Sequence, residues 1–403
     1  MSEVKPMISL DQALEIVKSQ VAGKTVRSET IPVRQGLGRI VIEDQIACLD
    51  LPPFNKSAMD GFAVRQDDIR QQYKLIETVP AGKVPAKKLE HGTAIKVMTG
   101  APVPEGAGQV IMVEHTRTAG DTVDVFCQSK ETHICLKGED IRRGDRVLKA
   151  PAVLGPLEIA NLISAGITTI KAAAKLNIAI LTTGDEIVDS PDLLESGKIM
   201  NSNGPLLEAL CRKYALDVTT NRIIPDEMQT TIEAMRDALN TADIVVLSGG
   251  VSAGDFDFAA AAMERIGLQV HFNRLAVKPG KPMTFASSDD KVVFGLPGNP
   301  VAVFLMFHLF VLYAARLLCG LHRRPCYVNL PLAADFHRRK ADRTAFIPCR
   351  LSDEGVLKTF PYHGTAHLHA LLESDGFFVV DQDVTEIAAG QRVRFLSIRD
   401  NFA

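Results

Sequence analysis

Hydrophobic and polar positions change their spacing along the chain, and these changes predict three kinds of structure in succession. Residues 8–24 carry apolar side chains at helical spacing, which predicts an amphipathic helix. Residues 30–150 consist mostly of short apolar runs broken by Gly and Pro, a pattern typical of short strands joined by turns. A second helical pattern follows at 156–164. This first part is therefore predicted to be β-rich.

From about residue 174 onward, apolar strands alternate with amphipathic helices. The strands are predicted at 175–181, 217–224, 244–247, 270–276, 283–285 and 292–295, and the helices at 205–214, 226–239, 258–266 and 300–318. Such alternation is typical of a mainly parallel, doubly wound α/β sheet. After residue 322 strands return without helices, at 327–332, 345–351, 377–380 and 391–397, which predicts a small β-barrel or sandwich.

Composition excludes several classes of protein. Hydrophobic residues make up 46% and charged residues 23% of the 403, which is the balance of a soluble globular protein. A net charge of −3, an aromatic content of 6% and the absence of Trp argue against a nucleic-acid partner. Seven cysteines without a C-x-x-C pair argue against a zinc ribbon or an iron–sulfur site.

One segment has the length of a membrane span, since residues 301–321 are almost continuously apolar. This segment contains His308 and Arg316 and directly follows a predicted strand and turn at 291–300. A helix buried beside the sheet explains it better than a membrane span. The first 20 residues show no export signal. We therefore expect a cytoplasmic protein with no membrane partner.

Polar loops follow four of the predicted parallel strands, at 182–186, 225–227, 248–257 and 295–300. Ligands of open parallel sheets bind beyond the carboxyl ends of the strands, so we expect these loops to open on one edge. Their glycines would let backbone N–H groups approach a phosphate, and their carboxylates would suit a Mg²⁺ ion that bridges to phosphate oxygens. Nearby, Lys278 and Lys281 surround a Pro-Gly turn and are placed to hold a second anion.

Each of these features has a simpler explanation when it is taken alone. A Ser-Gly-Gly run such as 248–250 is often only a tight turn, Asp226 is explained as a helix cap, and Pro300 as the first residue of a helix. The two lysines are explained as solvated residues of a hairpin. The combination of four such loops on one edge favours a phosphate and metal site over coincidence.

Three further segments are explained by local structure. The Asp-Gly turn at Asp60 and the loop at 98–107 follow from turn chemistry. Gly23-Lys24-Thr25 resembles the end of a P-loop, but it lacks the upstream glycine and follows a helix instead of a strand.

Seven segments, in this order, resemble the molybdopterin molybdenumtransferase (MoeA) family, which is related to the E domain of gephyrin. They are LPPFNKSAMDGFAV at 51–64, MTGAPVPEG at 98–106, KGEDIRRGD at 137–145, TTGDEIV at 182–188, SGGVSAGDFD at 248–257, VKPGKP at 277–282 and GLPGNPVA at 295–302. The resemblance spans essentially the whole chain, and seven motifs in register make it highly specific.

The resemblance implies a multidomain fold of the α/β plus β class. Its four expected parts are a discontinuous N-terminal α+β dimerisation domain at 1–45 and 145–173, an inserted β-rich domain at 46–144, an α/β molybdopterin-binding domain like the molybdopterin adenylyltransferases at 174–322, and a C-terminal β-barrel at 323–403. A homodimer with its active site at the subunit interface is implied as well.

The same resemblance implies Mg²⁺-dependent insertion of molybdate into adenylylated molybdopterin, which releases AMP and gives molybdenum cofactor. Matching positions imply a catalytic set of Asp60, Thr99, Glu186 and Asp257, and a metal-binding set of Asp140, Glu186, Asp226 and Asp257. The implied substrate-binding residues are Ser252, Lys278, Lys281, Pro282, Pro297, Gly298, Pro300, Arg343 and Thr365.

Two other functions compete with this one. An adenylyltransferase would activate molybdopterin, but those enzymes resemble Ser-Gly-Gly-Thr-Gly where this chain has Val251-Ser252, and the additional N- and C-terminal domains favour insertion. A scaffold that had lost the chemistry would not need the four residues Asp60, Glu186, Asp257 and Lys278, which are all present. A molybdopterin adenylyltransferase and molybdoenzymes that receive the product are the expected protein partners. Nothing in the sequence separates molybdate from tungstate.

Overall fold

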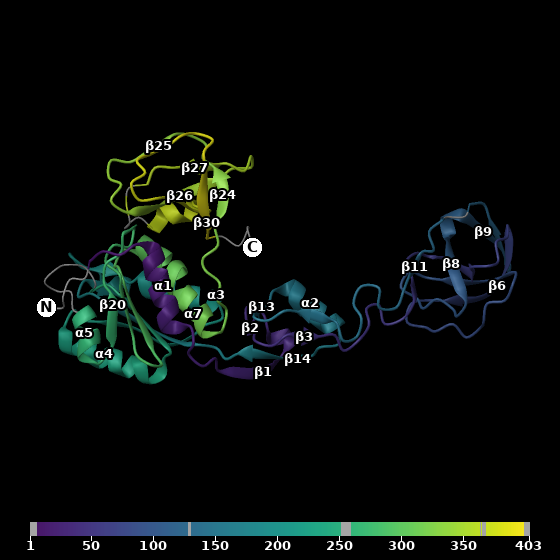
Figure 1. The fold of residues 1–403 in the computed structure, drawn as a ribbon, viewed down its shortest axis with the longest axis horizontal. Helices are drawn as coiled ribbons and strands as arrows, with labels where there is room; N and C mark the ends of the chain where they lie inside the picture. The colour runs from purple at the N-terminus through teal and green to yellow at the C-terminus, as the bar shows by residue number, and fades with distance from the viewer. Residues whose placement is uncertain (1–5, 128–129, 251–258, 363, 365–367, 399–403) are drawn as a thin grey trace. The chain divides into compact units, whose positions relative to one another are not determined.

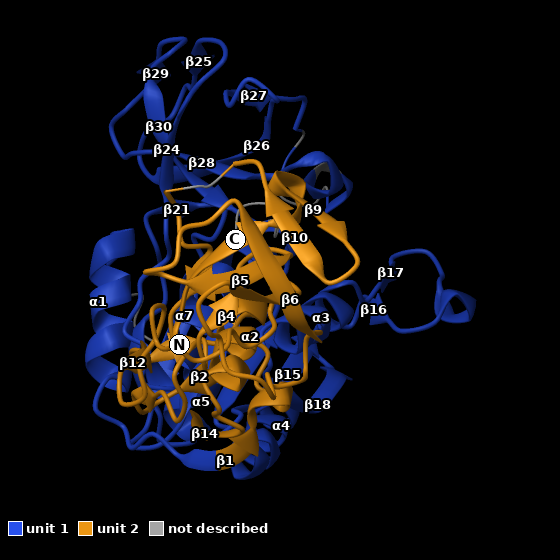
Figure 2. Ribbon diagram, turned by 90° about the vertical axis from the view of Figure 1, so that its right-hand side faces the viewer, with its two compact units in different colours: residues 1–29, 173–403 blue, residues 30–172 orange. Residues whose placement is uncertain are grey.

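The computed structural model describes residues 6–127, 130–250, 259–362, 364 and 368–398. The chain forms two compact units: unit 1 contains residues 1–29 and 173–403, and unit 2 contains residues 30–172 (Figure 2). The helix predicted near the N-terminus is present as α1 (Leu10–Val21). It begins at a capping box, in which Ser9 Oγ accepts from the backbone N–H of Gln12 and the Gln12 side chain accepts from the N–H of Ser9.

Unit 2 contains a six-stranded sheet in the order β8-β5-β7-β6-β10-β9, in which only β6 and β7 run parallel. Its apolar residues form two hydrophobic clusters around the buried β5 and β7. The bounds are β5 Gly61–Arg65, β6 Gln72–Val79, β7 Thr93–Val97, β8 Ala107–Met112, β9 Thr116–Ala119 and β10 Thr122–Val125. This part is β-rich, as the sequence predicted.

A second, smaller body of structure precedes and follows this sheet in the chain. Four short strands pair in the order β1-β14-β2-β13, and helix α2 (Pro156–Ser164) packs on them through Leu162. Strands β1 and β2 of this body therefore come before the six-stranded sheet in the sequence, and β13, α2 and β14 come after it. The remaining bounds are β1 Ser28–Pro32, β2 Ile40–Val41, β3 Gln45–Ile46, β4 Lys56–Ser57, β11 Ile134–Cys135, β12 Arg146–Leu148, β13 Ala152–Val153 and β14 Thr169–Ala173.

Unit 1 is built on a six-stranded sheet in the order β18-β15-β19-β23-β22-β20. The first four strands are parallel, whereas β22 and β20 are antiparallel to their neighbours, so the predicted doubly wound sheet ends in a mixed edge. The bounds are β15 Asn177–Thr183, β18 Asp217–Ile224, β19 Ile244–Ser248, β20 Gln269–Phe272, β22 Thr284–Ser287 and β23 Val292–Leu296.

Helices cover both faces of this sheet. α4 (Met228–Thr241) and α5 (Ala259–Arg265) pack together on one face through a cluster of small and branched apolar residues (Figure 1). α3 (Asn203–Lys213) and the closing helix cover the other face, where α1 packs on the end of the closing helix. The closing helix is α6 (Pro300–Met306), a π-helical turn at Phe307–Val311 and α7 (Leu312–Leu318).

The closing helix, Pro300–Leu318, is long and apolar enough to cross a membrane by length and composition. However, 78% of its most hydrophobic window is buried inside the structure. Apolar neighbours therefore explain its composition, as the sequence predicted from the strand and turn that precede it.

The C-terminal part of unit 1 is a curved sheet in the order β21-β26-β28-β30-β24, with a hydrophobic cluster of its own. Its first strand, β21 (Val277–Lys278), comes from the α/β part of the chain and pairs in parallel with β26. The other bounds are β24 Val328–Pro331, β25 Phe336–His337, β26 Thr344–Leu351, β27 Leu357–Thr359, β28 Gly376–Val380, β29 Glu386–Ile387 and β30 Arg392–Ser397.

Candidate functional site

The carboxyl ends of the four parallel strands lie level with one another. Thr183 at the end of β15 pairs with Ile224 of β18, and Thr182 pairs with Ser248 of β19. Ser248 in turn pairs with Leu296, the last residue of β23. The chain passes from β15 to β18 on one side and from β19 to strands on the other side, so the strand order reverses between β15 and β19. Open α/β sheets bind ligands at such a reversal, and the predicted common edge is confirmed.

The loop after β15 places two exposed carboxylates, Asp185 and Glu186, at this edge. The turn requires glycine, because Gly184 has a φ of +151° and a Cβ there would lie 2.7 Å from Glu186 Oε2. The chain then makes an excursion through β16 (Ile187–Val188) and β17 (Ile199–Met200). The excursion returns to the same loop, where Lys198 Nζ donates to the carbonyl oxygen of Asp185 at 2.8 Å.

Asp226 follows β18 and lies against these two carboxylates. Its backbone N–H donates to Asp185 Oδ1 at 3.2 Å. Burial raises the pKa of the Asp226 carboxyl, and the charges of Glu186 and Asp185 raise that pKa further. Within the described parts of the chain, none of these three carboxylates forms an ion pair with a Lys or Arg. The three carboxylates therefore lie close together and repel one another without an ion-pair partner among the described residues.

A group of carboxylate oxygens with uncompensated charge fits a hard divalent cation such as Mg²⁺. Among the residues that the structure describes, however, no three His, Cys, Asp or Glu side chains are grouped closely enough to hold a metal ion. Of the predicted metal set, Asp257 lies outside the described residues and Asp140 belongs to unit 2. Glu186 and Asp226 are the two members that the structure brings together.

The Ser-Gly-Gly loop after β19 packs directly on the end of β15. Gly249 has a φ of +96°, and a Cβ there would lie 2.5 Å from the carbonyl oxygen of Thr183, so only glycine fits. The N–H of Gly249 donates to the carbonyl oxygen of Leu296 at 3.1 Å, which joins this loop to the end of β23. Two predicted substrate-binding residues, Ser252 and Thr365, lie outside the described residues.

The loop between β23 and α6 lies beside the Ser-Gly-Gly loop. A Cβ on Gly298 would lie 3.8 Å from the Cα of Gly249, so the two loop backbones approach each other closely. Pro297 is buried, whereas Gly298 is exposed at the edge. Pro300 starts α6, which is the structural role that its position in the sequence suggested. The predicted Pro297, Gly298 and Pro300 thus lie at the same edge as the carboxylates.

The predicted anion-binding lysines lie where the α/β part meets the C-terminal sheet. Lys278 is the register partner of Ala345, and Arg343 stands just before the strand that contains Ala345. The Nε of Arg343 is buried, whereas Lys278 and Lys281 are exposed. Pro282 follows Lys281 directly. The structure therefore brings Lys278 and Arg343 close together, although they are far apart in the chain.

Three of the motif segments meet in unit 2. The N–H of Ser57 donates to the carbonyl oxygen of Ala101 at 2.9 Å, and the N–H of Gly100 donates to that of Ser57 at 2.8 Å. The third segment joins them where the N–H of Lys137 donates to Asn55 Oδ1 at 2.8 Å. The three segments hold one another in place through these contacts, so turn chemistry within each segment does not by itself explain their conformations.

Asp60 and Thr99 are in direct contact at the end of the six-stranded sheet. The backbone N–H and the hydroxyl of Thr99 each donate to Asp60 Oδ1 at 2.7 Å. These two bonds, and then the charge of Lys96, lower the pKa of the exposed Asp60 carboxyl. Asp140 lies on the third segment, where its N–H donates to the carbonyl oxygen of Leu51 at 3.0 Å. Asp60, Thr99 and Asp140 belong to unit 2, and the other described site residues to unit 1.

One buried residue at this edge, Asn203, was not among the predicted site residues. Its Nδ2 donates to Ser248 Oγ at 2.8 Å and to the carbonyl oxygen of Gly298 at 2.7 Å. The residue is only 6% exposed. These partners are 45 and 95 residues away in the chain, so no local pattern could have found them.

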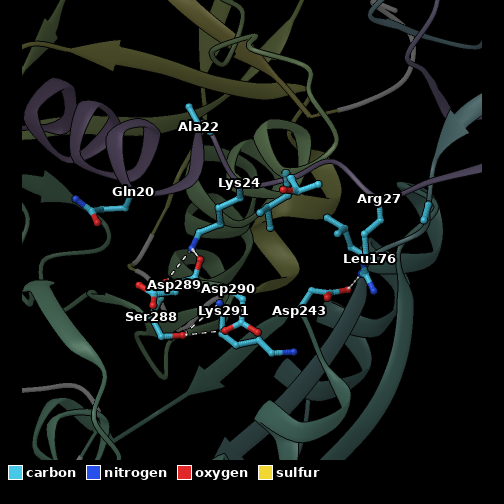
Figure 3. A pocket seen from close by; sticks show the side chains of 14 residues that line it. Gln20, Ala22, Lys24, Arg27, Leu176, Asp243, Ser288, Asp289, Asp290 and Lys291 are labelled. Atoms are coloured by element: carbon cyan, nitrogen blue, oxygen red, sulfur yellow. Dashed lines mark hydrogen bonds and ion pairs between the residues drawn. The ribbon is translucent and has the colours of Figure 1, made fainter.

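A polar cavity of about 810 Å³ lies near the amino ends of the same strands (Figure 3). Leu176 and Asp243, which immediately precede β15 and β19, line it. The charged groups that line it are held by the chain itself: Lys24 Nζ donates to the carbonyl oxygen of Ser288 at 2.8 Å, and Arg27 pairs with Asp243 at 2.5 Å. The cavity is therefore a structural feature, and Lys24 does not act as a P-loop lysine.

Comparison with known proteins gives matches along the whole described fold. The MoeA N-terminal region (domain I and II) matches residues 8–166, a probable molybdopterin binding domain matches 179–316, and the MoeA C-terminal region (domain IV) matches 329–398. These matches follow one another in the order that the resemblance implied.

Relatives and solved structures agree with these matches. A molybdopterin molybdenumtransferase of Staphylococcus aureus is 37% identical over 343 residues, which cover 83% of this chain and 81% of that protein. One of Staphylococcus epidermidis is 36% identical over 348 residues, which cover 83% and 82%. The crystal structure of a molybdopterin biosynthesis moeA protein from Pyrococcus horikoshii superposes with a TM-score of 0.82 at 28% identity, and the match covers 97% of this chain and 100% of that one. The multidomain α/β plus β fold class is confirmed, and the chain belongs to the molybdopterin molybdenumtransferase (MoeA) family.

Proposed function

We propose that this chain inserts molybdate into adenylylated molybdopterin in a Mg²⁺-dependent step that releases AMP and gives molybdenum cofactor. The observation that carries the proposal is the pairing of an uncompensated acidic group, Asp185, Glu186 and Asp226, with a glycine loop at the reversal point of the sheet. A phosphoanhydride substrate needs both features, because its phosphates must be held and their charge neutralised.

The phosphate side of the substrate would bind over the two glycine loops. Gly249 and Gly298 leave backbone atoms exposed to an incoming phosphate, since neither position carries a side chain. The N-terminus of α6 follows Gly298 directly and adds its positive end. These loops orient the anhydride toward the carboxylates of the neighbouring loops.

The proposed metal ligands are Glu186, Asp226 and Asp257, with Asp140 from unit 2. When bound, Mg²⁺ would neutralise the phosphates and stabilise the charge that develops on departing AMP. In the protein without metal, burial raises the pKa of Asp226 and repulsion from Glu186 and Asp185 raises it further; this repulsion is the electrostatic condition under which a cation binds favourably. The chain's own contribution is to hold these oxygens close together at some cost in stability.

Molybdate, as the second substrate, would bind between Lys278, Lys281 and Arg343, with Ser252, Pro282 and Thr365 completing the pocket. A tetrahedral dianion is held well by ammonium point charges and a guanidinium fork, and β21 pairs Lys278 with Ala345, two residues after Arg343. In this proposal Asp60 and Thr99 act on the reacting centre, where the two bonds from Thr99 keep Asp60 ionised.

A defined assay tests the proposal. Purified protein would be supplied with adenylylated molybdopterin, molybdate and Mg²⁺, and AMP release and cofactor formation would be followed. We expect molybdate-dependent release from the wild type and at least a tenfold loss in Asp60→Asn, which removes the charge and keeps the shape. Asp67→Asn is the matched control, since Asp67 is an exposed carboxylate of the same unit that pairs with Arg65. A folded wild type that released no AMP would favour the adenylyltransferase or scaffold alternatives.

We further propose a cytoplasmic homodimer whose active site is shared between subunits, with the four-part domain division implied by the family resemblance. Exposed apolar residues of unit 2 support a subunit contact: Leu37, Val153 and Leu157 are 61%, 42% and 81% exposed. They lie near one another because the N–H of Gly38 donates to the carbonyl oxygen of Leu154 at 2.8 Å.

Subunit mixing tests the shared site. Asp60→Asn and Glu186→Gln carry their changes in different units, so each variant alone would be inactive. If each site takes one unit from each subunit, a randomly exchanged equal mixture regains about a quarter of wild-type activity, because half of the dimers are mixed and each has one intact site. A mixture that stays inactive despite proven subunit exchange contradicts the shared site.

A further inference from the structure

The side chain of Asn203 connects three separate segments at the carboxyl edge of the sheet. It belongs to the first turn of α3, and its two amide hydrogens reach the end of β19, at Ser248 Oγ, and the β23–α6 loop, at the Gly298 carbonyl. Both acceptors are within 2.8 Å of Nδ2. The helix therefore holds two neighbouring strand ends through a single side chain.

The orientation of this amide is fixed by its partners. A carbonyl oxygen only accepts hydrogen bonds, so the Gly298 carbonyl requires that Nδ2, and not Oδ1, face it. Oδ1 is thereby turned away from these two acceptors, and among the described residues it is buried without a hydrogen-bond partner.

The segments that Asn203 joins are the ones proposed to hold the substrate phosphates. Gly249 follows Ser248 directly, and a Cβ on Gly298 would lie 3.8 Å from the Gly249 Cα. Small changes in the position of either loop would therefore change the distance between their backbones.

We propose that Asn203 is a positioning residue for bound molybdopterin: its amide sets the spacing of the Gly249 and Gly298 loops. This inference rests on the proposed function, because it takes the sheet edge as the substrate site. A purely structural tie would change stability alone, whereas a positioning residue changes affinity for the ligand as well.

Asn203→Asp separates these two roles. The carboxylate keeps the shape but loses both N–H donors, and at pH 8 it would face the Gly298 carbonyl as an unfavourable pair of acceptors. At pH 5.5 a larger fraction of the carboxyl is protonated and regains one O–H donor. We expect molybdopterin to bind about tenfold more weakly than to wild type at pH 8, and the deficit relative to wild type to shrink at pH 5.5. Melting temperatures of both proteins would be recorded at each pH.

Asn221→Asp is the matched control, because Asn221 Nδ2 also makes a contact with α3, donating to Glu208 Oε2 at 2.9 Å. It removes an amide donor to the same helix without touching either loop, so molybdopterin affinity should stay within about twofold of wild type. Ser248→Ala is a second, milder variant that removes one of the two bonds and keeps the protein folded; we expect a two- to fivefold loss, on the order of one neutral hydrogen bond.

The outcomes are distinct. Weaker binding in Asn203→Asp and Ser248→Ala with unchanged binding in Asn221→Asp supports the inference. Unchanged affinity in both Asn203→Asp and Ser248→Ala, or an equal loss in Asn221→Asp, overturns it while leaving the proposed function in place. A folded wild type that does not bind molybdopterin at all overturns the proposed function, and this inference falls with it.

Discussion

The carboxylate of Asp60 accepts two hydrogen bonds from one residue, Thr99, through the same oxygen. Both the backbone N–H and the hydroxyl of Thr99 lie 2.7 Å from Asp60 Oδ1. The contact forms because Gly61 and Val97 are register partners at the ends of β5 and β7, so the residues that flank them meet beyond the sheet. One oxygen of Asp60 is thus held by both donors of Thr99.

Thr99→Val should move the pH at which Asp60 loses its charge. The hydroxyl and the backbone N–H of Thr99 lower the pKa of Asp60, so removal of the hydroxyl raises that pKa. Asp60 then becomes protonated at a higher pH as the solution is acidified. The acidic limb of the pH–rate profile for AMP release should therefore move to higher pH. Thr99→Ser keeps the hydroxyl and should restore the wild-type limb. Identical limbs in all three proteins would contradict a role for the hydroxyl.

Asp226→Asn should stabilise the protein when no divalent cation is present. The pKa of Asp226 is raised in the folded state, so its ionised form is disfavoured there, and the resulting stability is lost as pH rises through the carboxyl range. At neutral pH without Mg²⁺ we expect the variant to melt a few degrees above wild type. Added Mg²⁺ should raise the melting temperature of wild type more than that of the variant.

Asp237→Asn is the control for this comparison, since Asp237 is an exposed carboxylate of α4 that lies 3.5 Å from Arg222. It should neither stabilise the metal-free protein nor change its response to Mg²⁺. An equal Mg²⁺ response in wild type and Asp226→Asn would argue against Asp226 as a metal ligand.

His308 should make the fold sensitive to acid. Its Nδ1–H donates to the carbonyl oxygen of Phe304 at 2.8 Å, and its Nε2 is buried without a partner in the π-helical turn. Burial lowers the pKa of His308 to about 4, and the charges of Lys213 and Arg316 act in the same direction. The neutral ring is preferred in the fold, so stability is complete above the unfolded pKa and falls as pH drops from 6.5 toward 4.

The loss from this group is at most about 3.4 kcal/mol, from 1.36 kcal/mol per unit of pKa difference. His308→Phe keeps an aromatic ring against Phe304 and removes the titration, so its free energy of unfolding should fall less between pH 7 and pH 4.5. Urea denaturation at both pH values measures this.

Lys24→Met should weaken the fold without affecting the proposed chemistry. Lys24 Nζ holds the turn between β22 and β23 through the carbonyl oxygens of Ser288 and Asp289, at the end of the strands opposite to the candidate site. We expect a loss of about 1–2 kcal/mol in the free energy of unfolding. AMP release by the folded variant should remain at the wild-type rate, and a large loss of rate at unchanged stability would assign the cavity a role in catalysis.

The sequence predicts the sheet edge well and the contacts across it poorly. Thr182 to Glu186 and Ser248 to Gly250 were found because strand ends in a parallel sheet converge wherever the strands alternate with helices. The sequence pattern did not distinguish the antiparallel strands β22 and β20 from the parallel strands, because buried strands of both kinds are continuously apolar. The contacts of Asn203 were missed because its bonding partners are set by tertiary packing and not by its neighbours in the chain.

The family resemblance supplied what periodicity could not. Turn chemistry explained Asp60 without any function, and only the motif placed it with Thr99 in a catalytic set. The contact between them agrees with that grouping. The roles of the individual site residues stay predictions until the variants described above are measured.

The short strand β21 has a consequence for how the protein unfolds. Val277 and Lys278 pair with Thr344 and Ala345, and the N–H of Ala276 donates to the carbonyl oxygen of Ile8 at 2.8 Å. Residues 276–278 of the α/β part thus form backbone hydrogen bonds with both the N-terminal segment and the C-terminal sheet. A calorimetric scan should show these regions melting in one cooperative transition. A chain cut after residue 322 would lack β26 and would leave β21 without its partner strand. We therefore expect the α/β part to be less stable when it is separated from the C-terminal sheet.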